Sequence, residues 1–534
     1  MTVKSSFGGR DGRTDTGVPM LISDIVEYAA RKRPDRVALR FEDETVTFAA
    51  LRDRVRRAAN ALRAVAAPGD RVAVLSGNRP EYVELYYAVP AAGMALTFLN
   101  HRLHPDEIAA LVAHAEASVL VVSGEYAAAM AGLRDAMPTV QLVVGLDGDG
   151  DRSYAGMLAD APATEPPRPG EDSVGWLVYT SGTTGRPKGV MLTHRNLVAG
   201  VAGSAASWEI PDGSVFLFCF PLCHVGGYAV LVNHLRACTV GLVRSYDNET
   251  FLRLVAEWKV TQTGLAPTMI AFLLGHPGIE DRDLGTLEAI GYGASAIPAE
   301  VLRRGMDVLG CDFYQGFGMS ETGGNILYFG TAEHRRAAAG ETHLLAAAGR
   351  AMDTADVRIV DDAFEDVPDG EPGEMIVRCD QVTAGYWRDP ELTAESFRDG
   401  WFRTGDVVRR DPDGMIYIVD RIKDMIVTGG ENVASREVEE VLYRHPAIAD
   451  AAVFGVPDAR WGEAVAAAVV VRPGHAGAIA ADDVIAFARE HLGGYKVPRK
   501  VEFVPELPRN VAGKVLKKDL RARRHEVTEV QEVS

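Results

Sequence analysis

The stretch from Tyr179 to Val190 gathers side chains suited to holding phosphate. It reads Tyr-Thr-Ser-Gly-Thr-Thr-Gly-Arg-Pro-Lys-Gly-Val, so its small, hydroxylated and cationic positions include Thr180, Ser181, Gly182, Thr183, Thr184, Gly185 and Lys188. Glycine lets backbone N–H groups approach an anion, hydroxyls donate hydrogen bonds or ligate a metal, and lysine adds positive charge. An ordered run of this composition favours a phosphate cradle over an ordinary surface turn.

The nucleotide loop of the P-loop ATPases is a competing interpretation. That loop ends in Gly-Lys-Ser/Thr, so that its lysine opens a helix beneath the phosphates. Here the order is Pro187-Lys188-Gly189, and both flanking residues disfavour a helix. We therefore expect the loop to be a flap between two strands, fed by the apolar run Val174 to Tyr179.

Bulk composition limits the classes of protein to consider. A chain of 534 residues is too long for one ordinary core, so two or more cores are expected. Lys and Arg total 56 against 74 Asp and Glu, and the resulting net charge of −18 argues against nonspecific nucleic-acid binding. No apolar stretch approaches the roughly 18 residues that span a bilayer, so we expect no stable membrane insertion and a cytoplasmic location. Residues 1–20 are polar and glycine-rich, which predicts a disordered N-terminus.

The five cysteines are predicted to be free and mostly buried. They are odd in number and include no Cys-x-x-Cys pair, which is typical of a reducing compartment. Cys219, Cys223 and His224 could suggest a metal site, but the run Phe216 to Leu222 is more typical of a buried strand.

Alternating strand and helix patterns must position these residues. Leu21 to Arg33 has a helical apolar stripe that ends at Pro34, and Thr47 is placed to cap a second helix. Short apolar runs separated by helical patterns predict a largely parallel, covered sheet, and hence an α/β fold. The proline-rich segment Ala161 to Gly170 is interpreted as a linker between two subdomains. The expected strands are Arg71–Leu75, Val119–Val122, Leu142–Val144, Thr239–Val243, Gln262–Ala266, Leu287–Tyr292 and Asp312–Gln315.

The pattern changes near Asp420, where a charge-rich stretch precedes shorter strands and helices. The expected strands are Ala451–Val456, Val465–Val471 and Val501–Val504, with helices at Ser435–Tyr443 and Asp482–His491. We predict a large domain at residues 21–419 and a small, mobile α+β domain at residues 420–534. The hinge is expected near residues 420–423.

Further glycine-rich and charged motifs give the chain a resemblance to a known family. They include Gly291-Tyr292-Gly293-Ala294-Ser295, Gly316-Phe317-Gly318-Met319-Ser320-Glu321-Thr322, Trp401 to Asp406, Asp420-Arg421-Ile422-Lys423-Asp424 and Leu507 to Val515. With the loop at Tyr179 to Val190, they resemble the signature elements of the adenylate-forming (ANL) superfamily, and above all its acyl-CoA synthetases. The resemblance runs from about Leu21 to about Arg521 and implies that superfamily's large α/β domain and small C-terminal domain.

The resemblance implies how ATP and Mg²⁺ are bound. Glu321 and Thr184 would share Mg²⁺, Asp406 would accept both ribose hydroxyls, and Arg421 would reach ribose or phosphate. Lys514 would bridge the incoming carboxylate and the α-phosphate. Phe317 and Ser320 stand where the family usually has tyrosine and threonine, so a tyrosine hydroxyl contact to the nucleotide is lost. The remaining implied nucleotide contacts are Thr180, Ser181, Gly182, Thr183, Gly185, Lys188, Gly293, Ala294, Ser295, Gln315, Gly316, Gly318 and Met319.

The acyl site is implied by the run from Phe220 to Gly227, which resembles the family's Pro-x-x-His-x-x-Gly element. His224 would gate the carboxylate, although a hydrogen-bonded core histidine is the alternative. No acidic residue occurs from Val225 to Val232, which argues against an amino-acid substrate. The small residues Gly226, Gly227, Ala294 and Ser295 are expected to leave room for a sizeable apolar group. The implied pocket is His224, Val225, Gly226, Gly227, Gly291, Gly293, Gly318 and Met319.

Coenzyme A is implied as the acyl acceptor. Gly429-Gly430-Glu431 resembles the form found in CoA ligases, where glycine lets the backbone lie along a pantetheine arm. Gly385 to Pro390 matches the same ligases. The implied activity has two steps: a carboxylic acid and ATP form an acyl-adenylate and pyrophosphate, and CoA then takes the acyl group after the small domain turns about Lys423.

Two alternatives remain open from the residues. A freestanding ligase could load the phosphopantetheine of a carrier protein instead of CoA, and a noncatalytic adenylate-binding sensor would share the fold. The acid could be a fatty, aryl or polycyclic one. A homodimer is common in similar ligases.

Overall fold

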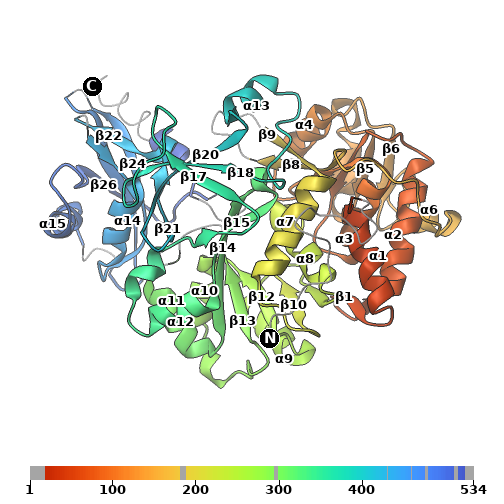
Figure 1. Ribbon diagram of the computed structural model, residues 1–534, viewed down its shortest axis with the longest axis horizontal. Helices are drawn as coiled ribbons and strands as arrows, with labels where there is room; N and C mark the ends of the chain where they lie inside the picture. The colour runs from red at the N-terminus through yellow and green to blue at the C-terminus, as the bar shows by residue number, and fades with distance from the viewer. Residues whose placement is uncertain are drawn as a thin grey trace.

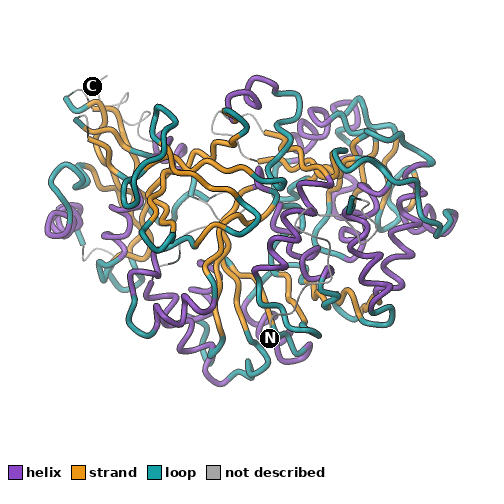
Figure 2. Tube along the Cα trace, viewed as in Figure 1, coloured by secondary structure: helices purple, strands orange, loops and turns teal. Residues whose placement is uncertain are grey.

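The computed structural model describes residues 19–180, 188–293, 297, 299–429, 431–458, 460–475, 479–509 and 515–522. Within these residues the chain forms four β-sheets, two of them large and covered by helices. Figure 1 shows the chain's first third in one lobe, the following strands β10, β12 and β13 beside it, and the C-terminal elements at the opposite end. Figure 2 shows helices between the strands of the two large sheets as well as at the periphery.

The seven-stranded sheet carries the phosphate-loop strands. Its order is β7-β6-β5-β3-β4-β8-β9, and all neighbours are parallel except β8 and β9. This confirms the largely parallel sheet predicted from the alternating pattern. The strands are β3 (Arg71–Leu75), β4 (Ala95–Phe98), β5 (Val119–Val122), β6 (Leu142–Gly145), β7 (Arg152–Ser153), β8 (Val174–Thr180) and β9 (Lys188–Thr193).

The predicted role of the proline-rich segment as a divider was wrong. Because β8 pairs with β4, the strands before and after residues 161–170 belong to the same sheet. The segment lies against α2 (Phe48–Arg63), where Arg57 and Asn60 donate hydrogen bonds to the carbonyls of Ala161 and Pro162. Its prolines suit an extended strap without internal hydrogen bonds, but such a strap also crosses the surface of a single unit.

The nine-stranded sheet carries the predicted nucleotide motifs on β13 and β14 and the predicted acyl motif after β10. Its order is β16-β15-β14-β13-β12-β10-β11-β1-β2, with parallel pairing from β14 through to β1 and antiparallel strands at both edges. The strands are β1 (Val37–Phe41), β2 (Glu44–Thr47), β10 (Val215–Phe218), β11 (Thr239–Leu242), β12 (Gln262–Leu265), β13 (Ala289–Tyr292), β14 (Asp312–Met319), β15 (Gly324–Phe329) and β16 (Arg350–Ala351).

One predicted strand is shorter than expected. The run Phe216 to Leu222 is apolar throughout, yet β10 ends at Phe218. Pro221 has no backbone N–H for a ladder, and Asn78 bonds the Phe220 carbonyl and the Leu222 N–H at 2.8 Å each, which holds the chain in a turn. Cys223 and His224 therefore lie on a loop beyond the strand.

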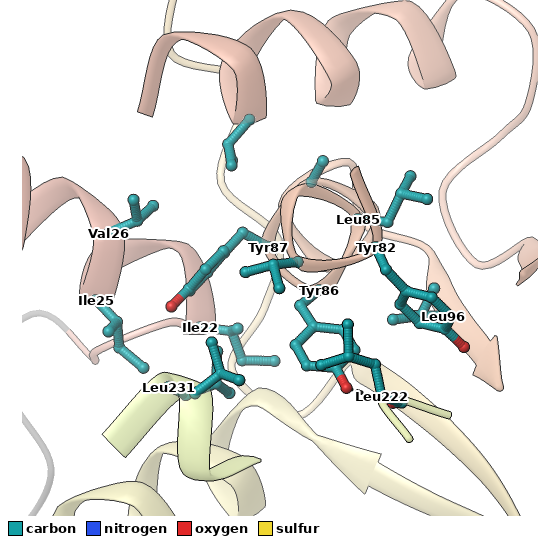
Figure 3. Packing of buried hydrophobic residues seen from close by; sticks show 14 of the residues in the cluster. Ile22, Ile25, Val26, Tyr82, Leu85, Tyr86, Tyr87, Leu96, Leu222 and Leu231 are labelled. Carbon is teal, nitrogen blue, oxygen red and sulfur yellow. Dashed lines mark hydrogen bonds between the residues drawn. The ribbon is translucent and has the colours of Figure 1, made fainter. Parts of the chain in front are cut away.

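Helices between the two large sheets form the main core. The helix α1 (Ile22–Lys32) buries Ile22, Ile25, Val26, Ala29 and Ala30, as the apolar stripe predicts. The Thr47 hydroxyl accepts the Ala50 N–H at 3.2 Å and so caps α2 as predicted. Figure 3 shows side chains of α1 and α3 (Pro80–Ala91) meeting those of α8 (Tyr228–Leu235), with α7 (His194–Ser207) packed against α8. The other helices of the large sheets are α4 (Pro105–Ala115), α5 (Gly124–Ala131), α6 (Tyr154–Asp160), α9 (Asn248–Trp258), α10 (Pro267–Leu274), α11 (Ala299–Leu309) and α12 (Thr331–Ala338).

Two five-stranded sheets follow in the chain. The first comprises β17 (Asp356–Val360), β18 (Gly373–Arg378), β19 (Phe397–Arg398), β20 (Trp401–Arg410) and β21 (Ile416–Arg421), with α13 (Pro390–Ser396) before β19. The second comprises β22 (Ile426–Thr428), β23 (Glu431–Val433), β24 (Ile448–Asp458), β25 (Gly462–Val471) and β26 (Lys500–Phe503), and packs on α14 (Ser435–Tyr443) and α15 (Ala481–His491). This last sheet has its own apolar core. The boundary between a large and a small domain at residue 420, and the hinge there, stay predictions.

All five cysteines are free thiols, and Cys219, Cys223 and Cys238 are buried. Among the described residues, no helix is both long and apolar enough to cross a membrane.

Candidate active site

The residues of the predicted phosphate loop connect β8 with β9, and these two strands pair with each other. Thr180 ends β8 and faces Lys188, the first residue of β9, across the antiparallel pair. The predicted flap between strands is confirmed at both of its ends, and Lys188 opens a strand rather than a helix. Ser181, Gly182, Thr183, Thr184 and Gly185 lie outside the described residues, so their role stays a prediction.

The chain at residues 384–387 lies along the other edge of β9. The Met191 N–H bonds the Gly385 carbonyl at 3.0 Å, and the Trp387 N–H bonds the Gly189 carbonyl at 2.7 Å. A Cβ on Gly189 would lie 3.2 Å from that of Trp387, so glycine permits this close approach. The register brings Tyr386 beside Lys188.

Tyr386 connects Lys188 with Glu321. Its hydroxyl donates to Glu321 Oε1 at 3.0 Å, and Lys188 Nζ lies 5.7 Å from the centre of its ring. The Glu321 carbonyl also accepts the Thr383 N–H at 2.7 Å, so the same segment fixes both ends of the glutamate. Glu321 is buried, with 8% of its surface exposed. A buried carboxylate and an ammonium group therefore lie on either side of the Tyr386 side chain, at the start of β9.

Strand β14 and the short helical turn Ser320–Thr322 carry most of the predicted nucleotide motif. Gln315, Gly316, Phe317, Gly318 and Met319 lie at the end of β14, and Ser320 opens the turn. A Cβ on Gly316 would overlap the Asn325 side chain, and one on Gly318 would overlap the Gly324 carbonyl. A Cβ on Gly293 would lie 2.6 Å from the Gly316 carbonyl. These glycines let β13, β14 and β15 approach one another, while Ala294 and Ser295 lie outside the described residues.

His224 sits on a loop anchored by α3. Asn78 holds the chain on both sides of Pro221, and the Tyr86 hydroxyl donates to the Leu222 carbonyl (Figure 3). The Gly227 N–H closes the loop on the His224 carbonyl at 2.9 Å. Burial, followed by the charges of Arg102 and His101, lowers the pKa of His224 to about 4. The imidazole is therefore neutral near pH 7, and its buried Nε2 has no hydrogen-bond partner among the described residues.

The glycines of the predicted acyl pocket differ in what surrounds them. A Cβ on Gly226 would meet nothing within 4 Å, so space exists beside it. A Cβ on Gly227 would overlap the Tyr86 hydroxyl, and one on Gly291 would lie 2.6 Å from the Tyr314 ring. The expectation that Gly227 leaves room for substrate was therefore wrong, because a tyrosine fills the space its side chain would take. Val225 is half-buried and starts the short turn that leads into α8.

Asp406 and Arg421 face each other across the β20–β21 pair. Arg421 Nε lies 3.1 Å from Asp406 Oδ1, and Asp406 is 2% exposed. Burial distinguishes this contact from an exposed ion pair, which contributes little to stability. The buried carboxylate is held at the end of the sheet nearest the predicted hinge.

Lys423 follows two residues later on the turn Ile422–Asp424. The pKa of Lys423 is lowered, mainly by partial burial of its ammonium group. Asp424 opposes this shift, and the cations Arg421, Lys188 and Arg521 add to it. Much of the residue nevertheless reaches solvent. The influence of Lys188 shows that the predicted hinge and the phosphate-loop strand are close in this structure.

Gly429 requires glycine on two grounds. Its φ is +62°, and a Cβ would lie 2.8 Å from the Trp461 ring. Its N–H donates to the Trp461 carbonyl at 2.8 Å. Glu431 is exposed at the start of β23, whereas Gly430 lies outside the described residues. The backbone at Gly429, which was predicted to lie along the pantetheine arm of CoA, is thus packed beside the indole ring of Trp461.

Lys514 also lies outside the described residues, but the chain on both sides of it is anchored. Arg509 and Val515 form an isolated antiparallel bridge. Lys517 Nζ lies 2.8 Å from Glu439 Oε1 and donates to Ser435 Oγ at 2.6 Å. Lys517, three residues after Lys514 in the sequence, is therefore attached to α14.

Several contacts at this site were missed from the sequence. Tyr386 lies in the Gly385–Pro390 run, which was noted as a motif without a role being given to the tyrosine. Asn78, Tyr86 and Arg102 carry no motif at all, and their positions beside the His224 loop follow from packing between α3 and the turn after β10.

Comparison with known proteins identifies the family of this chain. The family model described as AMP-binding enzyme matches residues 26–387, and that of the AMP-binding enzyme C-terminal domain matches residues 437–514. A feruloyl-CoA synthase from Amycolatopsis is 40% identical over 92% of this chain and 97% of its own. The medium/long-chain-fatty-acid–CoA ligase FadD8 of Mycobacterium tuberculosis is 35% identical over 93% of this chain and 88% of its own. The structure of the amide bond synthetase McbA from Marinactinospora thermotolerans superposes with a TM-score of 0.85 at 31% identity, covering 94% and 99% of the two chains.

A large α/β domain followed by a small C-terminal domain, with a buried glutamate and a lysine beside a glycine-rich loop, defines an adenylate-forming enzyme. The chain belongs to the AMP-binding enzyme family and, within it, to the AMP-forming acyl-CoA synthetases.

Proposed function

We propose that the enzyme activates a hydrophobic carboxylic acid in two steps that use opposite faces of the small domain. In the first step a carboxylate oxygen attacks the α-phosphorus of ATP, the bond to the β-phosphate oxygen breaks, and pyrophosphate leaves. In the second step the CoA thiolate attacks the acyl carbon and AMP leaves. The contacts of Tyr386 with Glu321 and Lys188 support this proposal, because they bring a buried carboxylate and a cation together at the start of β9, directly after the predicted phosphate loop.

The residues present fit a magnesium ion bound mainly through ATP. Mg²⁺ commonly takes one or two carboxylates and completes its shell with phosphate oxygens and water. Glu321 supplies one buried, oriented carboxylate, and Thr184 is the proposed second ligand. The ion would neutralise charge on the departing phosphates. Lys188 adds a mobile positive charge on the same side.

The acid side of the reaction is assigned to His224 and the space beside Gly226. A neutral imidazole can lie next to the incoming carboxylate without forming a competing salt bridge, and it can donate or accept one hydrogen bond. Lys514 would offset repulsion between the carboxylate and the α-phosphate. Asp406 and Arg421 would hold the ribose. The proposed location is the cytoplasm, where ATP and CoA are available.

Separating the two half-reactions tests the proposal. Lys514→Ala is expected to lower adenylation on the order of 10²-fold or more, because it removes a transition-state charge contact, while the variant still converts supplied acyl-AMP and CoA to thioester. Lys518→Ala, an exposed lysine four residues further on, is the matched control and should keep both activities. Equal loss of both half-reactions in Lys514→Ala would contradict the assignment.

A second pair of variants tests the hinge. Lys423→Pro restricts the backbone at the junction and should spare adenylation but block thioester formation, whereas Lys423→Ala should retain both. Thioester yield with CoA is measured beside that with phosphopantetheinylated carrier proteins. Higher efficiency with a carrier protein would reassign the acceptor while leaving the adenylation step in place.

A further inference from the structure

Four aromatic side chains, from Trp208, Tyr228, Tyr314 and Tyr328, form a cluster beside the predicted acyl pocket. Trp208, at the end of α7, lies 6.0 Å from the Tyr228 ring and 5.7 Å from the Tyr314 ring, measured between ring centres. The Tyr314 and Tyr328 rings are 6.1 Å apart. The four residues come from α7, α8, β14 and β15, so the cluster spans the helical and the sheet side of the region. We call it the aromatic cluster.

The cluster lies against residues assigned to the acyl pocket. Tyr228 directly follows Gly226 and Gly227, and a Cβ on Gly324 would lie 2.8 Å from its ring. Gly324 pairs with Met319 at the end of β14. Tyr314 lies five residues earlier on that strand, a distance of about 17 Å along the chain, and covers Gly291. The rings therefore run from the predicted reaction centre toward the beginning of β14.

Some polar atoms of the aromatic cluster have hydrogen-bond partners and others have none among the described residues. The Tyr228 oxygen accepts hydrogen bonds from Ser204 Oγ at 3.3 Å and from the Asn325 N–H. Trp208 is 7% exposed, and its buried Nε1–H has no acceptor among the described residues. The Tyr328 hydroxyl is likewise buried without a partner in this part of the chain. Two buried donors of the cluster thus lack an acceptor among the described residues.

Buried donors without acceptors favour one class of ligand over another. A saturated alkyl chain beside these two donors would supply no acceptor, so both would stay buried without a hydrogen bond, which costs free energy. A planar aromatic ring packs well against tyrosine and indole rings, and an oxygen substituent on that ring supplies the missing acceptor. Sites built to hydrogen-bond a substrate group discriminate strongly against analogues that lack it.

We propose that the aromatic cluster lines the distal end of the acyl site, and that Trp208 Nε1–H and the Tyr328 hydroxyl recognise an oxygen-bearing substituent on an aromatic carboxylic acid. This inference rests on the proposed ligase function and names its substrate class. Trp208 and Tyr328 would determine specificity without touching the reacting carboxylate. The aromatic ring itself would lie beside Tyr228 and Tyr314.

An acid panel with purified full-length enzyme tests the proposal. Pyrophosphate release and CoA thioester formation are measured with cinnamic acid, with its 4-hydroxy and 4-methoxy derivatives, and with octanoic and decanoic acids. The oxygenated aryl acids should give the highest kcat/KM. A preference for the saturated acids, or for unsubstituted cinnamic acid, would overturn the inference.

Variants then locate the recognition. Trp208→Phe keeps an aromatic face but removes the donor, so kcat/KM for the oxygenated acids should fall about tenfold, while that for cinnamic acid changes by less than twofold. Tyr328→Phe removes a single oxygen and should act in the same direction. Trp258→Phe, in α9 outside the cluster, is the matched control and should leave the ratio of the two acids unchanged. An equal loss for both acids in Trp208→Phe and Tyr328→Phe would show a structural role and overturn the inference.

The same panel separates this inference from the function beneath it. Pyrophosphate release with saturated acids alone would overturn the substrate class and leave the ligase function intact. Absence of pyrophosphate release with every acid would contradict the ligase function itself.

Discussion

At the scale of single residues, a tyrosine hydroxyl orients the carboxylate assigned to the metal. Tyr386 and Glu321 are 65 positions apart, and their 3.0 Å contact depends on residues 384–387 joining the edge of β9. Partners that hold a metal ligand commonly tune metal affinity as strongly as a ligand does. Tyr386 is therefore expected to act through Glu321 rather than on substrate.

Tyr386→Phe is expected to raise the Mg²⁺ concentration needed for half-maximal adenylation by about tenfold, because the carboxylate loses the hydrogen bond that orients it. ATP–pyrophosphate exchange measured over a range of Mg²⁺ concentrations reports the shift. Tyr417→Phe removes a similar hydroxyl–carboxylate contact, 3.1 Å from Asp411, away from this site and is the control. An unchanged Mg²⁺ requirement in Tyr386→Phe would show that Glu321 is oriented by other means.

At the scale of elements, the fit between α3 and the start of α8 positions the His224 loop. Tyr86 contacts the Leu222 carbonyl and occupies the space beside Gly227, while Gly226 faces open space. Adjacent glycines therefore have different functions: Gly227 admits a helix side chain, and Gly226 leaves room on the substrate side.

Gly227→Ala should destabilise the protein by about 1–3 kcal/mol and raise the KM for the acid, because the added methyl forces Tyr86 and the loop apart. Gly226→Ala, at the neighbouring position, should leave the thermal midpoint within error, since nothing lies within 4 Å of the added Cβ. Thermal unfolding and acid saturation curves of both variants provide the comparison. Similar midpoints for the two variants would contradict the packing argument.

The elements themselves were largely predictable from the sequence. Val119–Val122 and Ser435–Tyr443 have the predicted bounds, and Thr47 caps its helix, because each depends on local pattern and capping chemistry. The end of β10 at Phe218 and the continuous sheet across residues 161–170 were not predictable in this way. Both depend on partners far away in the chain: Asn78 for the turn, and β4 for β8.

The same division applies to the site. The roles of Glu321, Lys188 and Asp406 were inferred from motifs, since each motif repeats residue types that the chemistry requires. The contacts of Tyr386, Tyr86 and Trp208 arise from tertiary packing, which residue spacing does not encode. The assigned roles of all these residues remain predictions that the proposed variants test.

At the scale of the whole molecule, polar contacts connect β21, at the predicted hinge, with α14 and with Lys517 near the C-terminal end of the described residues. The Asp420 carboxylate accepts the N–H groups of Arg421 and Ser435, and Ser435 Oγ accepts a hydrogen bond from Lys517. Lys517 also pairs with Glu439, whose pKa is raised by burial although Lys517 opposes the rise. This arrangement attaches Lys517 to α14 and α14 to β21.

Lys517→Met should destabilise the small domain by about 3–5 kcal/mol, because it leaves the Glu439 carboxylate buried without its cation. The double variant Lys517→Met/Glu439→Leu should recover much of that loss, since it removes both charges together. Chemical denaturation followed by Trp461 fluorescence reports on this domain. Additive losses in the double variant would contradict coupling between the two side chains.

The position of β1 in the nine-stranded sheet has a consequence for biosynthesis. β1 pairs with β2 on one side and with β11, at Thr239–Leu242, on the other. Nearly 200 residues separate β1 from β11, and at 5–20 residues per second a ribosome needs roughly 10–40 s to make them. One edge of β1 therefore stays unpaired until β11 has been synthesised. During that interval chaperones can protect the exposed strand from pairing with another chain.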